Sequence, residues 1–244
     1  MSNIKLIVEY DGTHYHGWQY QLNAKTVQGE MLKAIKKITG EDVNLIGAGR
    51  TDAGVHAIGQ VANFKSNSSV PISRLPYALN SVLPDDIVVK AAEKVDDSFH
   101  ARKSAIGKEY RYYILNSELP SALLKNRVYH YKYRLDLDAM KRGAELFIGT
   151  HDFSAFKAAG SNVESSVRTI KRLDLNRIDE LIELVIQADG FLYNMVRIIT
   201  GTLIWVGNGK LMWSDVRDVI NSRDRSKAGP TVPPYGLYLY KVFY

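Results

Sequence analysis

Residues 47–56 read GAGRTDAGVH. This stretch combines three glycines with one arginine, Arg50, and one carboxylate, Asp52, and it lies between the apolar runs NLI (44–46) and AIGQVANF (57–64). Glycines allow the backbone to turn sharply and to approach a ligand closely. The apolar flanks place the loop near a core, so Asp52 beside Arg50 is a candidate nucleophile or base.

The loop also admits simpler interpretations than a catalytic one. Its glycine spacing does not fit a phosphate-binding loop or a dinucleotide fingerprint. A surface turn, in which Asp52 bonds its own backbone and Gly54 takes a positive φ, is the plain structural alternative. The sequence offers no obvious second carboxylate for glycosidase chemistry and no serine–histidine signature. An arginine from the MVR stretch (195–197) could approach Asp52 and keep its carboxylate ionised.

The stretch DGTHYHGW (11–18) is the rival candidate for a functional site. His14 and His16 lie two residues apart with Asp11 nearby, and a His-x-His pair can bind zinc. The alternative is a loop of polar and aromatic residues without a metal.

Composition bounds the class of protein. The chain has 244 residues, 45% of them apolar and 24% charged, as is usual for a globular protein. It has no cysteine, which excludes disulfides and thiolate metal sites. The first residues show no secretory signal, and no apolar run approaches the roughly 18 residues that span a bilayer. We therefore expect a cytoplasmic protein that does not enter the membrane.

The charge indicates a polyanionic partner. The formal net charge is +6, and residues 104–244 carry 20 basic and 15 acidic side chains against 12 and 11 in residues 1–103. The chain also has 15 tyrosines and 7 phenylalanines, and tyrosine can stack on a base while its hydroxyl stays in water. RNA or DNA is the commonest partner of such a protein.

Hydrophobic periodicity predicts an α+β fold made of two similar halves. The polar stretch 96–107 is the best boundary, so we expect domains at 1–103, with the Asp52 loop, and 104–244, the more basic half. Thr26 and Gly40 are the expected caps of the first long helix. Strands are predicted over 3–10, 59–65, 86–95, 108–116 and 235–244, a hairpin over 167–191, and helices over 26–40, 71–84, 136–149, 194–209 and 213–222.

Six motifs along the chain resemble those of the tRNA pseudouridine synthase A family. They are VEYDGTHYHGWQYQ (8–21), GAGRTDAGVHAIGQVANF (47–64), FHARKSAIGKEYRYYI (99–114), FIGTHDFSAF (147–156), DGFLYNMVRIITGTL (189–203) and AGPTVPPYGLYL (228–239). They occur in the family's order over nearly the whole chain, and the central motif shows no departure from the family pattern.

The resemblance implies the fold, the reaction and the site. It implies two α/β-sandwich-like halves, with mostly antiparallel sheets, that meet at a catalytic cleft. It implies a homodimer that isomerises uridine to pseudouridine at positions 38, 39 and 40 of the tRNA anticodon stem-loop, without a cofactor or metal. Asp52 matches the catalytic aspartate and Tyr110 the tyrosine that packs against the uracil. Arg50 matches an arginine associated with base entry, and Arg197 an arginine expected to pair with the carboxylate.

Three other hypotheses stay open at the level of sequence. The protein could bind RNA without catalysis, although Asp52 argues against this. It could be a metal-dependent hydrolase that uses Asp11, His14 and His16. It could also be a pseudouridine synthase for another structured RNA, because shape decides much of RNA recognition.

Overall fold

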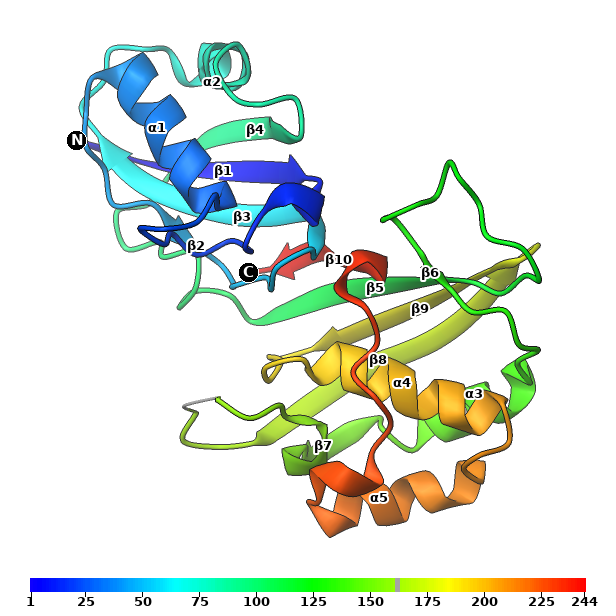
Figure 1. Ribbon diagram of the computed structural model, residues 1–244. Helices are drawn as coiled ribbons and strands as arrows, with labels where there is room; N and C mark the ends of the chain where they lie inside the picture. The colour runs from blue at the N-terminus through cyan, green and yellow to red at the C-terminus, as the bar shows by residue number, and fades with distance from the viewer. Residues whose placement is uncertain (161–162) are drawn as a thin grey trace. The chain divides into compact units, whose positions relative to one another are not determined.

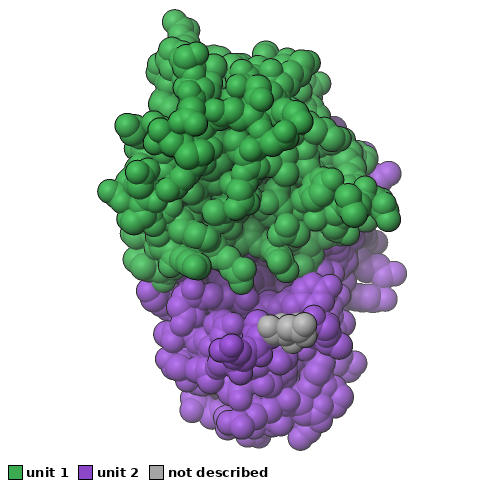
Figure 2. Space-filling view, turned by 90° about the vertical axis from the view of Figure 1, so that its left-hand side faces the viewer, with its two compact units in different colours: residues 1–106, 238–244 green, residues 107–237 purple. Residues whose placement is uncertain are grey.

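The computed structural model describes residues 1–160 and 163–244. The chain forms two compact units, unit 1 with residues 1–106 and 238–244 and unit 2 with residues 107–237, coloured separately in Figure 2. No helix among the described residues is both long and apolar enough to cross a bilayer.

Unit 1 contains a mostly antiparallel sheet in the order β4–β1–β3–β10, with the short strand β2 paired to β3 (Figure 1). The pairing of β10 with β3 is parallel. Its elements are β1 (Ser2–Tyr10), α1 (Val27–Thr39), β2 (Ile46–Gly47), β3 (His56–Ser66), α2 (Leu75–Asn80), β4 (Ile87–Val95) and β10 (Leu237–Phe243). Short 3₁₀ turns lie at Gly12–His14 and Ile72–Arg74.

The sequence explains the first strand and helix of unit 1. β1 alternates, so that its inward side chains from Ile4 to Tyr10 are buried while those between them are half-buried. Thr26 caps α1 by accepting a hydrogen bond from the Gly29 N–H, and Gly40 ends it in the left-handed conformation at φ 74°. Both predicted caps are therefore confirmed.

Unit 2 contains antiparallel strands in the order β5–β9–β8–β7, with β6 parallel to β5. Helix α3 packs against α4 and β8 (Figure 1). The elements are β5 (Gly107–Leu115), β6 (Tyr129–His130), α3 (Leu137–Glu145), β7 (Gly149–Asp152), β8 (Val167–Ile178), β9 (Leu181–Ala188), α4 (Met195–Gly207) and α5 (Val216–Ser222). Four 3₁₀ turns lie at Ser154–Phe156, Trp213–Asp215, Arg225–Lys227 and Pro234–Gly236.

Helix α4 is the buried helix of unit 2. All but two of its residues are buried, and its threonines satisfy their hydroxyls internally, as Thr200 does by donating to the Val196 carbonyl at 2.8 Å. Gly201 allows the chain at Pro230 to pass directly over the helix, because a β-carbon there would lie 1.9 Å from the Pro230 carbonyl oxygen.

The predicted class, a mixed α+β fold with mostly antiparallel strands, is confirmed. The helix predicted over 71–84 is wrong in length, because a 3₁₀ turn precedes α2 and α2 ends at Asn80. The helix predicted over 136–149 ends at Glu145, since Gly149 turns at φ 108° into β7, a strand that the periodicity did not reveal.

Candidate active site

The loop that carries Asp52 joins β2 to β3 in unit 1. It closes in a turn in which the Val55 N–H donates to the Asp52 carbonyl at 3.1 Å and Gly54 takes φ 77°. The positive φ at Gly54 is the feature that the surface-turn alternative expected. Arg50 is exposed and Asp52 is half-buried, so the loop presents a cation and a carboxylate two residues apart.

The stretch 10–18 packs against this loop and holds its main chain. The Trp18 N–H donates to the Thr51 carbonyl at 3.1 Å, and the Gly54 N–H donates to the Tyr15 carbonyl at 3.3 Å. Gly17, at φ 85°, approaches the loop so closely that a β-carbon would lie 2.4 Å from the Thr51 carbonyl oxygen. The backbone is therefore held on both sides of Asp52.

The loop's exit into β3 is held in the same way. The Gly12 N–H donates to Nδ1 of His56 at 3.0 Å, and a β-carbon on Gly12 would lie 2.0 Å from the Val55 carbonyl oxygen. The buried His56 ring stacks on Tyr238 with centroids 4.6 Å apart. His56 therefore helps to hold the end of the Asp52 loop, a role that no sequence pattern indicated.

The zinc hypothesis for stretch 11–18 finds no support. The Asp11 carboxylate accepts hydrogen bonds from the N–H and the hydroxyl of Thr13, at 3.0 and 2.5 Å, and caps the 3₁₀ turn. His14 and His16 are exposed. No three His, Asp or Glu side chains within 1–160 and 163–244 are grouped as metal ligands.

In unit 2, Tyr110 lies in β5 opposite Ile186 of β9. Its ring is buried and packs edge-on against Phe191, with centroids 5.0 Å apart. An aromatic ring fixed by such a contact offers a rigid surface on which a planar base can stack.

Arg197 lies in the first turn of α4. Its Nε donates to the Val232 carbonyl at 2.7 Å, and another guanidinium nitrogen donates to Oδ1 of Asn194 at 2.6 Å. Asn194 precedes the helix in the left-handed conformation at φ 61°. The N-terminus of a helix carries a partial positive charge and attracts anions. The positive charge of Arg197 therefore does not stabilise α4, but it adds to the attraction for an anion at this end of the helix.

The environment of Tyr112 shows how strongly this region is buried. The Tyr112 hydroxyl donates to the Pro233 carbonyl at 2.8 Å. Burial raises the pKa of Tyr112 well above its ordinary value, and the charge of Arg197 opposes that rise. Tyr112 is therefore neutral at physiological pH.

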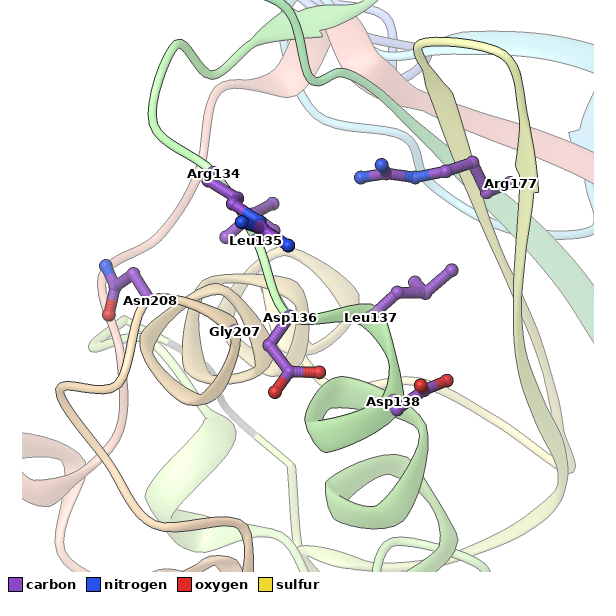
Figure 3. Close-up of a pocket in the computed structure, with 8 residues that line it drawn as sticks. All are labelled: Arg134, Leu135, Asp136, Leu137, Asp138, Arg177, Gly207 and Asn208. Carbon is purple, nitrogen blue, oxygen red and sulfur yellow. The ribbon is translucent and has the colours of Figure 1, made fainter.

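The four predicted site residues fall into two pairs. Arg50 and Asp52 share one loop of unit 1, and Tyr110 and Arg197 belong to unit 2. None of the four lines the cavity of about 550 Å³ shown in Figure 3. That cavity opens between the start of α3 and the end of α4 and carries both signs of charge, from Arg134, Arg177, Asp136 and Asp138.

Comparison with known proteins shows the family to which this chain belongs. A family model described as tRNA pseudouridine synthase matches residues 6–102 and 144–244, which include the Asp52 loop and α4. The chain therefore belongs to the tRNA pseudouridine synthase family.

Within that family, the relatives are similar over their whole length. The chain is 58% identical to proteins named tRNA pseudouridine synthase A from Thermoanaerobacter pseudethanolicus and Acetivibrio thermocellus, and 54% identical to one from Caldicellulosiruptor saccharolyticus. Each alignment covers 100% of both chains. A solved H/ACA RNP bound to a substrate RNA containing 2′-deoxyuridine matches at a TM-score of 0.36 and 14% identity, over 82% of this chain and 44% of that one.

Proposed function

We propose that this protein isomerises uridine to pseudouridine in the anticodon stem-loop of tRNAs, at positions 38, 39 and 40. The observation that carries the proposal is the family match across the Asp52 loop, together with relatives of the same length named tRNA pseudouridine synthase A. The loop's geometry supports it, since Asp52 lies half-buried on a backbone that is fixed on both sides.

The reaction requires that the bond between C1′ and N1 of the uridine break and a bond between C1′ and C5 form. The proton leaves C5 and N1 gains a proton, so the product has the atoms of the substrate and no oxidant or reductant is consumed. In the proposed mechanism Asp52 starts the first step by one of two routes. It attacks C1′ as N1 leaves, and the bond between Asp52 and C1′ breaks again when C5 bonds to C1′. Alternatively it removes a ribose proton to give a glycal and returns that proton to the ribose when C5 bonds to C1′. No cofactor is required by this balance.

The other predicted site residues have proposed roles in handling the base. Tyr110 stacks on the detached uracil and keeps it in place while it turns. Arg197 pairs with the catalytic carboxylate and keeps it ionised. Arg50, exposed beside Asp52, contacts a phosphate or fills the space that the base leaves.

The target uridine must leave its stack before Asp52 can reach it. Unstacking and unpairing cost a few kcal/mol, which the contacts to the rest of the tRNA have to offset. We propose that phosphate contacts from exposed Lys and Arg side chains supply most of this binding. The domains at 1–103 and 104–244, the homodimer and the cytoplasmic location belong to the same proposal.

The test is a modification assay on an unmodified tRNA transcript with uridines at 38 to 40. Pseudouridine is mapped by carbodiimide labelling and primer extension, and a transcript with cytidine at the three positions is the control. We expect new stops at these positions on the first transcript and none on the second.

Other outcomes point to other functions. Tight binding without any stop would favour a protein that binds RNA without catalysis. Stops that remain when 38 to 40 are cytidine would place the target elsewhere in the tRNA. Stops only on a different structured RNA would contradict the proposed substrate.

A further inference from the structure

Three buried polar side chains lie directly behind the Asp52 loop. Tyr10 ends β1, Gln60 lies within β3, and Thr51 immediately precedes Asp52. Only 3%, 0% and 6% of these residues, respectively, is exposed. Polar groups buried this fully cost free energy unless they are hydrogen-bonded, so their arrangement needs a reason.

Two hydrogen bonds hold the residues on either side of Arg50, one at the side chain of Thr51 and one at the main chain of Gly49. The Tyr10 hydroxyl and Oγ1 of Thr51 lie 2.7 Å apart. Nε2 of Gln60 donates to the Gly49 carbonyl at 2.8 Å. The residues before and after Arg50 are thereby tied to two neighbouring strands of the sheet.

One polar atom of the set stays without a partner. Among the described residues, Oε1 of Gln60 is the buried side-chain atom that lacks a hydrogen-bond partner. Burial raises the pKa of Tyr10, so its hydroxyl stays protonated and either donates to Oγ1 of Thr51 or accepts from it.

The anchored residue Thr51 lies between the two charged residues of the loop. Arg50 is exposed, Thr51 is buried and Asp52 is half-buried. A hydrogen bond that holds the Thr51 side chain in the interior therefore restricts the main chain from which Arg50 and Asp52 extend, in a loop with glycines at 47, 49 and 54.

We infer that Tyr10, Thr51 and Gln60 are positioning residues that hold Asp52 at its reactive geometry through this buried network. The inference rests on the proposed function and adds a role for residues that do not touch the substrate. A misplacement of about 1 Å at a reacting group can reduce a rate by about 100-fold, so such a network is expected to affect turnover more than binding.

The test compares Tyr10→Phe and Thr51→Val with two controls. Thr51→Ser keeps the hydroxyl. Tyr244→Phe removes a different tyrosine hydroxyl of unit 1, which donates to the Ala101 carbonyl at 2.9 Å. Each variant is measured for single-turnover tritium release from a tRNA transcript labelled at uridine C5, for the tRNA dissociation constant, and for Tm.

For Tyr10→Phe and Thr51→Val we expect rates reduced by about 10-fold or more, with tRNA affinity within about 3-fold of the wild type. The double variant should be no slower than the slower single variant, because both changes break the same connection. Thr51→Ser should retain most of the rate, and Tyr244→Phe should lose Tm without losing rate.

Several results would overturn the inference. One is a Thr51→Val enzyme as fast as Thr51→Ser, a comparison that holds even if Tyr10→Phe fails to fold. Another is a rate loss in Tyr10→Phe and Tyr244→Phe that is in the same proportion to the loss of Tm in both variants, because general destabilisation would then explain it. If the wild type releases no tritium, the proposed function fails and the inference with it. An active wild type with unaffected variants would refute the positioning role alone.

Discussion

Gly17 lies against the carbonyl of Thr51 so closely that a β-carbon at residue 17 would be 2.4 Å from that oxygen. Its φ of 85° is in a region that only glycine adopts without strain. The residue before Asp52 is thus fixed by a contact from the stretch 10–18, which the sequence alone presented as a possible metal site.

Gly17→Ala is expected to reduce turnover because the added methyl group displaces the Asp52 loop. Gly40→Ala is the matched control, since Gly40 also has a positive φ but no atom within 4 Å of the position that a β-carbon would take. Both should lose about 1 kcal/mol of stability from backbone strain, and Gly17→Ala more because of the clash. Urea unfolding and tritium release measure the two effects. Equal activity in both variants would contradict a role for Gly17 in seating the loop.

Tyr110→Phe should keep activity within about 10-fold of the wild type, because the ring that stacks on the base and packs on Phe191 stays in place. Tyr110→Ala should lose far more, since it removes the stacking surface. Single-turnover rates on the labelled transcript distinguish the two variants. If Tyr110→Phe is as inactive as Asp52→Ala, the hydroxyl has a chemical role and stacking is not the main function of the residue.

The contribution of individual cations to tRNA binding is open to a direct comparison. The sequence suggests Lys65, Arg168, Lys171, Arg172, Arg223, Arg225 and Lys227 as phosphate contacts. In the structure Arg172 pairs with Asp174 and Arg223 with Asp152, whereas Lys171 makes no ion pair or side-chain hydrogen bond with a described residue.

Lys171→Ala should therefore weaken tRNA binding. The association constant falls as salt rises, and in this variant the steepness of log K against log salt should decrease by about 0.7 to 0.9, the value for one phosphate contact. Arg172→Ala should change the slope less, because its charge is already partly neutralised. Filter binding over a series of salt concentrations gives both slopes. An unchanged slope for Lys171→Ala would remove this residue from the interface.

Asp152 provides a prediction about stability and pH. Its carboxylate accepts hydrogen bonds from the Ser154 N–H and hydroxyl at 3.0 and 2.6 Å. These bonds lower the pKa of Asp152, with a further contribution from Arg223 and with burial opposing. A lowered pKa means that the stabilisation is present above the ordinary value of an aspartate and is lost as pH falls through the folded value.

Asp152→Asn should therefore be less stable than the wild type by about 1 kcal/mol at pH 7, because the amide oxygen can still accept these hydrogen bonds but lacks the charge that strengthens them. The difference should shrink as pH falls below the ordinary pKa of an aspartate and through the lowered pKa of the folded protein. Urea unfolding over a series of acidic pH values measures it, with the free energy compared at each. A difference that stays the same over the whole series would show that the charge of Asp152 does not stabilise the fold.

Much of the fold could be predicted from local patterns. The alternation in β1, the caps Thr26 and Gly40 of α1, and the β8–β9 hairpin follow from residues close together in the sequence. The parallel pairing of β10 with β3 could not be predicted in this way, because nothing near residue 237 encodes which strand it will join.

The part of the site that lies in one sequence motif could be predicted. Asp52 and Arg50 could be singled out because a carboxylate and a guanidinium share a glycine-rich loop. Tyr10, Thr51 and Gln60 could not, since each looks like an ordinary strand or loop residue until the fold buries it. Gln60 does not stand out even within β3, because that strand also buries the polar residues His56, Asn63 and Ser66.

The measurement that tests the central claim most directly compares wild type with Asp52→Ala and Asp52→Asn. Each protein is titrated against a tRNA transcript in a gel-shift assay and then assayed for single-turnover tritium release from uridine C5. We predict that both variants bind within a few-fold of the wild type and release no tritium above background. Tritium release close to the wild-type rate, or a loss of tRNA binding that accounts for the lost activity, would contradict the assignment of Asp52 as the catalytic residue.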